Sequence, residues 1–158
     1  MGAFANQNLE TIPANAGIGE VFTASPYAVK TFNNYDDGLK VGYFVQDKAG
    51  VISSLDGTST PNIVGVVKRD IAGYLESDTI QKNLPYPKQV VDIVNFGGVS
   101  VATIDGATIT DGDLVYVVNS GDNAGKATNV ATSNIAVNAI FQHAVDGGWK
   151  IVIKNYIS

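Results

Sequence analysis

The chain has 158 residues, of which 45% are hydrophobic, and it contains no cysteine. This length suffices for one domain with its own core, and the lack of thiols excludes disulfides, zinc–thiolate sites and a cysteine nucleophile. A net charge of −5 and a pI of about 4.6 argue against binding to nucleic acid or anionic lipid. No apolar run is long enough to span a membrane.

The first part of the chain is predicted to be an extended arm. Residues 5–26 show no sustained helical or strand-like period, and their only charged side chains are Glu10 and Glu20. Aromatic side chains are nevertheless frequent up to residue 35. In a segment with no element to bury them, such side chains are typical of anchors on another protein. We therefore expect residues 1–36 to form an arm and residues 37–158 a β-rich body.

The body is predicted to consist of short strands separated by glycine turns. Asp-Gly pairs, which suit hairpin turns, occur five times. The turn signals recur at the spacing of an all-β sandwich or barrel. The expected strands are, in chain order, 38–46, 62–69, 88–96, 98–104, 113–119, 134–145 and 149–157.

Three segments are less clear. Residues 70–80 are compatible with one or two helical turns, which Gly73 weakens. Residues 135–145 could be helical, but the alternation of apolar residues favours a strand. Residues 125–134 are small and polar and are expected to form an exposed loop. The predicted fold class is therefore mainly β, an antiparallel β-sandwich or barrel with an extended N-terminal arm and at most one short helix.

Two motifs that could carry chemistry are incomplete. GDNAGKAT at 121–128 has only three residues between its glycines, and no Ser or Thr directly follows Lys126, so it lacks the spacing of a phosphate-binding loop. The single histidine, His143, could act as a general base, but only Asp146 is a nearby acid. We expect 121–128 to be a plain loop and His143 to be a strand residue.

Acidic residues cluster at one place. Asp105, Asp111 and Asp113 could gather a calcium ion, but the spacing of an EF-hand with its closing Glu is missing, and turn formation already explains them. The sequence therefore predicts no metal site, no cofactor and no catalytic residue.

Lys68 and Arg69 end the apolar run 65–67. Two interpretations stay open. The pair can mark a strand that leaves the core for solvent, or it can contact an acidic partner, to which a guanidinium is well suited.

Several features, in this order along the chain, resemble the structural cement, or decoration, proteins of tailed bacteriophage heads. They are Phe4 with Asn6-Gln7, Pro13-Ala14, Gly17 to Glu20, the ASP step at 24–26, VGYFV at 41–45, GVVKRDIAGYL at 65–75, the proline turn at 84–91 and GDLVYV at 112–117. They span most of the chain. The sequence departs from the family pattern at Tyr86-Pro87-Lys88 and at Lys68.

The resemblance implies a β-rich body that binds the outside of a capsid, often self-associates and catalyses no reaction. The leading interpretation is a virion protein, made in the host cytoplasm, that stabilises an icosahedral head at contacts between major capsid protein subunits. Its expected partners are the major capsid protein and itself, as a dimer or trimer, with no nucleic acid and no membrane. The expected capsid contacts are Phe4, Leu9, Ile12, Ile18, Val21, Phe22, Lys68 and Arg69.

Other interpretations compete with this one. A tail-tube, head-fibre base or adsorption protein could have a similar build. A carbohydrate-binding or hydrolytic β-domain would need clustered aromatic faces or a carboxylate pair at fixed separation, and only Trp149 is present as a tryptophan. The arm could also fold back over its own body.

Overall fold

The computed structural model describes residues 18–22, 26–69, 79–80, 90–104, 108–155 and 157. Within these residues the regular structure is all β, so the mainly β prediction is confirmed. None of the described segments forms a helix that could cross a membrane. The strands are β1 (Ala28–Phe32), β2 (Leu39–Lys40), β3 (Phe44–Lys48), β4 (Val51–Ser54), β5 (Ile63–Val67), β6 (Thr79–Ile80), β7 (Val91–Ala102), β8 (Leu114–Val117), β9 (Ala127–Thr128), β10 (Ile135–Val145) and β11 (Gly148–Ile153).

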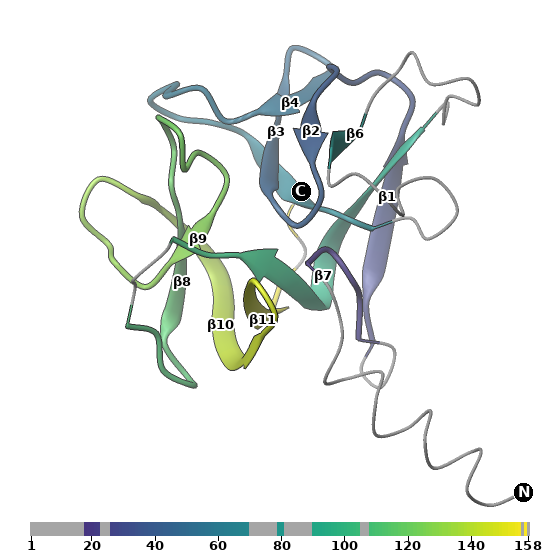
Figure 1. The fold of residues 1–158 in the computed structure, drawn as a ribbon. Coiled ribbons are helices and arrows are strands. Elements are labelled where there is room, and N and C mark those ends of the chain that lie inside the picture. The colour runs from purple at the N-terminus through teal and green to yellow at the C-terminus, as the bar shows by residue number, and fades with distance from the viewer. Residues whose placement is uncertain are drawn as a thin grey trace, which may run out of the picture.

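One large antiparallel sheet dominates the molecule. Its order is β4-β3-β5-β7-β11-β10-β8-β9, and β1 also pairs with β7. The small sheet of β2 and β6 stands apart from this path. Figure 1 shows the long strand β7 between two groups of strands, with β8 to β11 on one side and β1 to β6 on the other.

The sheet curls until its two ends meet. The Phe44 amide at the start of β3 donates to the Gly125 carbonyl (2.8 Å), and the Gly57 amide after β4 donates to the Asn119 carbonyl (2.8 Å). Residues from one end of the strand order are thereby hydrogen-bonded to loops from the other end. The result is a curled antiparallel sheet, a half-barrel, which agrees with the predicted mainly β fold class.

The concave side of the sheet encloses the larger of two hydrophobic cores. Alternate residues of β8, β10 and β11 point into it, as the period of two in a strand requires. Phe141 and Trp149 meet there edge to face, with ring centroids 5.8 Å apart. The buried members of this inner core are Phe44, Leu55, Ile63, Val66, Val94, Val99, Val101, Ile109, Val115, Val117, Ala127, Ala139, Phe141, Ile151 and Ile153.

A second core covers the opposite side of part of the sheet. Neighbouring residues divide between the two cores: Phe44 and Val94 belong to the inner core, whereas Val45 and Ile93 belong to the second. The second core therefore lies on the outer face of β3, β5 and the first half of β7. Its buried members are Tyr35, Leu39, Val41, Val45, Ile52, Val64, Val67, Val91 and Ile93.

The strand predicted at 38–46 is interrupted. Residues 41–43 leave the β conformation between β2 and β3, and Gly42 has a φ of 79°. The Gly42 amide donates to Val67, and the Gly42 carbonyl accepts from Ala102, so this turn is bonded to β5 and β7. The alternation within 38–46 predicts one face with Leu39, Val41, Tyr43 and Val45. Leu39, Val41 and Val45 do belong to the second core, whereas the half-buried Tyr43 does not.

The two strands predicted at 88–96 and 98–104 are one strand, β7. Gly97 and Gly98 resemble a turn in sequence, but the chain continues through them. Gly97 has a φ of 88°, and a Cβ placed there would lie 2.3 Å from the Pro26 carbonyl oxygen. The glycine therefore allows close backbone approach within a strand instead of ending it.

Four other predicted strands are confirmed. They correspond to β5, β8, β10 and β11, and residues 135–145 form a strand and not a helix. The helix considered at 70–80 is wrong for Thr79 and Ile80, which form β6 with β2, and residues 70–78 lie outside the described part. The prediction of an exposed loop at 125–134 is wrong for Ala127 and Thr128. These residues form β9, pair with β8 and are buried.

Parts of the predicted arm pair with strands of the body. Residues 28–32 form β1, which pairs with β7, and Tyr35 is only 2% exposed within the second core. Residues 18–22 likewise lie along β7. The described residues up to 36 are therefore part of the body, because β7 supplies the hydrogen bonds that they could not form alone. Residues 1–17 and 23–25 lie outside the described part.

Candidate interaction surface

The segment 18–22 is held along β7 by backbone hydrogen bonds. The Gly19 amide donates to Ser100 O (2.7 Å), and the Phe22 amide donates to Gly98 O (3.1 Å). Together with the isolated bridge between Val21 and Val99, these bonds lay the segment along β7, which the sequence did not predict because the segment has no strand-like period of its own.

Arg69 fastens the start of this segment. Its backbone amide donates to Gly19 O (2.8 Å), and its side-chain Nε donates to Ile18 O (2.9 Å). Lys68 Nζ donates to the Arg69 carbonyl at 3.4 Å. The sequence left two interpretations open for this basic pair. The structure adds a third for Arg69, which holds the N-terminal segment on the body through intramolecular hydrogen bonds.

Phe22 covers a gap that a glycine leaves on the sheet. Phe22 lies against Gly98, where an added Cβ would be 3.3 Å from the Phe22 Cβ. The Phe22 side chain is 9% exposed. His143 meets its ring edge to face at 6.0 Å, and Lys150 Nζ lies 4.2 Å from the ring centroid. Burial lowers the pKa of Lys150. His143 is thus an exposed strand residue packed on an aromatic ring, as expected.

The eight residues predicted as capsid contacts fall into two groups. Ile18, Val21, Phe22, Lys68 and Arg69 gather around the end of β5 and the second half of β7. Phe22 is buried by its own chain, whereas the other four are half-buried. The remaining three, Phe4, Leu9 and Ile12, lie outside the described residues. Contact of any of them with a capsid stays a prediction.

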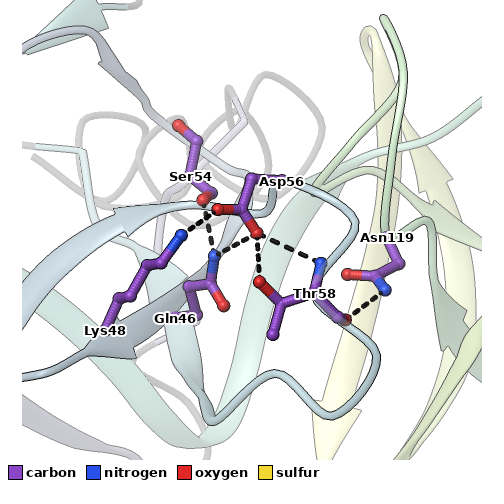
Figure 2. A network of polar contacts seen from close by, with 6 residues as sticks. All are labelled: Gln46, Lys48, Ser54, Asp56, Thr58 and Asn119. Atoms are coloured by element: carbon purple, nitrogen blue, oxygen red, sulfur yellow. Dashed lines mark hydrogen bonds and ion pairs between the residues drawn. The ribbon is translucent and has the colours of Figure 1, made fainter.

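A polar network fastens the seam where the half-barrel closes (Figure 2). The Asp56 carboxylate forms an ion pair with Lys48 and accepts hydrogen bonds from Gln46 Nε2 (3.2 Å) and Thr58 Oγ1 (2.6 Å). Asn119 Nδ2, from the loop after β8, donates to Thr58 O (2.8 Å). The network therefore ties β3, the loop after β4 and the loop after β8 together.

We expect Asp56→Asn to lower the unfolding temperature in a pH-dependent way. The hydrogen bond from Lys48, followed by those from Thr58 and Gln46, holds the pKa of Asp56 well below its usual 3.8. Because the folded-state pKa is depressed, the carboxylate stabilises the fold above about pH 4 and loses this effect as the pH falls below it. Thermal unfolding of wild type and variant should therefore differ at pH 7 and converge in acid.

The matched control is Asp122→Asn, which removes an exposed carboxylate outside this network. It should leave the unfolding temperature nearly unchanged at both pH values. Equal unfolding temperatures for Asp56→Asn and wild type at pH 7 would show that the network does not stabilise the closure.

The described residues offer no arrangement for metal chemistry. They contain no group of three or more potential ligands that could hold a metal ion. Asp113 instead accepts hydrogen bonds from the Thr110 amide (2.9 Å) and from Asn129 Nδ2 (2.8 Å), which lower its pKa. Asp105 lies outside the described part. Asp113 therefore serves as a turn residue, as the sequence favoured.

The segment 121–128 forms part of the closure and not a phosphate cradle. Gly125 is buried, and its carbonyl accepts the bond from Phe44. A depression of about 430 Å³ lies beside it, where Lys40 Nζ sits 5.3 Å from the Tyr43 ring centroid. Its lining residues are Lys40, Tyr43, Phe44, Ser54, Leu55, Gly121, Asp122 and Ala124.

Comparison with solved structures places this architecture among phage capsid components. One chain, from a structure described as the capsid of Myoviridae phage XM1, superimposes with a TM-score of 0.85 at 32% sequence identity, covering 90% of this chain and 92% of that chain. The family model described as XM1 gp53 minor capsid protein matches residues 4–155. The chain belongs to this family of minor capsid proteins. No curated protein matches the sequence.

Membership of a phage capsid family agrees with the resemblance drawn from the sequence. The position of Trp149 argues against the carbohydrate-binding alternative. Trp149 packs against Phe141 in the inner core, so this tryptophan does not present a free stacking face for a sugar ring.

Proposed function

We propose that the protein binds the outer surface of an assembled phage head, at contacts between major capsid protein subunits, and stabilises the head. The observation that supports this most is the match to a minor capsid family over nearly the whole chain, residues 4–155. It is located in the virion as a structural component without catalytic activity. Self-association on the shell as a dimer or trimer is part of the same proposal.

The N-terminal segment of residues 1–17 is proposed to dock on the shell. Phe4, Leu9 and Ile12 are its branched-chain and aromatic residues, and Glu10 is its only charged side chain. Its exit point is fixed, because Arg69 and β7 hold Ile18 and Gly19 in place. A fixed exit restricts where the segment can search, which lowers the entropic cost of docking.

Stabilisation then follows from linkage. A protein that binds only the assembled shell shifts the equilibrium toward assembly, and many copies multiply the effect. Burying each large apolar side chain of the segment contributes about 1.5–3 kcal/mol, and the ordering of its backbone offsets much of this. The segment alone is therefore a weak anchor, and the β body must contribute contacts of its own.

Binding to heads tests the proposal. Purified protein mixed with expanded heads that lack it should pellet with them at a fixed, saturating ratio. The decorated heads should then resist heat better than bare heads. Saturable binding to isolated tails but not to heads would contradict the proposal and favour a tail component.

A further inference from the structure

Among the residues that the structure describes, the outer face of the half-barrel is covered on one half only. The second core lies over β3, β5 and the first half of β7, and none of its members packs over β8, β10 or β11. In those three strands Val115, Phe141 and Ile151 point into the inner core. The residues that alternate with them therefore point outward.

Three of these outward residues form a continuous apolar row. In the strand register Ile140 stands opposite Val152 on one side and opposite Leu114 on the other. Residues directly opposite one another in antiparallel strands share a face and have Cβ atoms about 4.5–5.5 Å apart. Leu114 is 61% exposed, and Ile140 and Val152 are half-buried. We call Leu114, Ile140 and Val152 the outer row.

The outer row ends beside the N-terminal segment. Val152 stands opposite Gly98 of β7, and Phe22 lies over Gly98. At the other end, Val130 follows β9, the strand beside β8, and is 52% exposed. The outer row thus begins beside residues 18–22, the segment that lies along β7.

The strands of this face are basic, in contrast to the whole chain, although Glu20 of the segment 18–22 lies beside Ser100, the register partner of Lys150. The strands β8, β10 and β11 contain no Asp or Glu, although the chain has 15 acidic and 10 basic residues. Lys150 lies two residues before Val152, and the exposed Lys154 lies two residues after it. Asp113, next to Leu114, has its carboxylate engaged by Thr110 and Asn129.

We propose that the outer row is the face that docks on the capsid shell, and that it fits an apolar strip of the shell subunit bordered by carboxylates. The inference rests on the proposed function and specifies which side of the body meets the shell. Lys154 has no side-chain hydrogen bond or ion pair among the described contacts, so its charge is available to a partner. Complementary charge at the rim of an apolar contact fixes orientation and excludes wrong partners.

A second copy of the chain fits this face poorly. A two-fold dimer through the outer row would bring the same patch of both copies together. Lys150 and Lys154 of one copy would then face those of the other, with no carboxylate from these strands between them. Like charges that face one another across an interface oppose association.

Head binding by surface variants tests this assignment. Leu114→Asp places a charge on an exposed position, and Lys154→Glu reverses a charge at an exposed position, so both variants should fold. Each should weaken binding to expanded heads about tenfold, as expected for a central apolar contact and a paired rim charge. The control is Lys30→Glu, the same charge reversal at an exposed position on β1, which should bind as wild type does.

Salt dependence gives a second readout. Wild-type binding should weaken as salt rises, and Lys154→Glu should weaken less steeply because one attractive pair is gone. If wild type, Leu114→Asp and Lys154→Glu all bind heads with the same affinity, the assignment of the face is overturned and the proposed function stays intact. The assignment would also be overturned if the Leu114→Asp substitution dissociated an oligomer in solution while the variant bound heads normally. Failure of wild type to bind heads would remove both proposals.

Discussion

Replacing Gly65 with alanine is expected to lower the unfolding temperature strongly. Gly65 lies in the middle of β5 with a φ of 145°, and a Cβ placed there would lie 2.2 Å from the Val94 carbonyl oxygen of β7. Real Cβ atoms do not approach backbone oxygens so closely, so the central pairing of β5 with β7 would have to separate. A φ of this kind alone costs about 1–3 kcal/mol for a residue other than glycine.

The loss should remove a substantial part of the stability of the fold. Small domains are stable by about 5–15 kcal/mol, and substitutions that overpack a core cost about 1–3 kcal/mol or more. Circular dichroism during thermal unfolding measures the outcome. Gly112→Ala is the matched control, because Gly112 also has a positive φ of 92° but no atom within 4 Å of the added methyl group. Similar unfolding temperatures for the two variants would show that the close approach at Gly65 is not a constraint.

Deleting residues 1–17 is expected to leave a folded body that protects heads against heat less well than the full chain does. The bonds that hold Ile18, Gly19 and Phe22 on the body all remain in this truncated chain. Its unfolding temperature should therefore stay close to that of the full chain. Its binding to expanded heads should weaken at least tenfold, because the apolar anchors Phe4, Leu9 and Ile12 are lost.

A longer deletion separates anchoring from folding. Removing residues 1–25 also removes Phe22 and the other residues bonded along β7, and it leaves Arg69 Nε without its acceptor on Ile18. This chain should unfold at a distinctly lower temperature, since each lost hydrogen bond costs about 0.5–1.5 kcal/mol. Full protection of heads by the chain that lacks residues 1–17 would contradict the role proposed for the segment.

The strands that the sequence predicts best are those whose side-chain pattern is local. In β10 the alternation of Ile135, Val137 and Ala139 predicts a strand, and the Asp-Gly turn predicts its hairpin with β11. Both predictions are confirmed by the pairing of these strands. In β2 and β3, the shared face of Leu39 and Val45 is correct even though the strand breaks between them.

The errors come from contacts between distant parts of the chain. Gly97 resembles a turn because the sequence cannot show that Pro26 approaches it, 71 positions earlier. Residues 18–22 have no period of their own, and their conformation depends on β7 and on Arg69, which is 51 positions from Ile18. For the same reason the sequence could not show that residues 28–32 pair with β7.

The outer row could be predicted only in part. Alternation within each strand indicates that Leu114 and Val152 face away from Val115 and Ile151. Whether that outer face is covered depends on where the second core ends, and this is decided by how residues 33–43 fold over β3 and β5. The sequence therefore indicates which residues point outward but not which of them stay available to a partner.

A cryo-EM map of heads decorated with the full-length protein tests the central proposal most directly. The half-barrel is predicted to lie on the outside of the shell, with Leu114, Ile140 and Val152 toward a major capsid subunit and residues 1–17 continuing from Ile18 along the shell surface. Density that places the protein inside the shell, or that turns β3 and β4 toward the subunit while the outer row faces solvent, would contradict it.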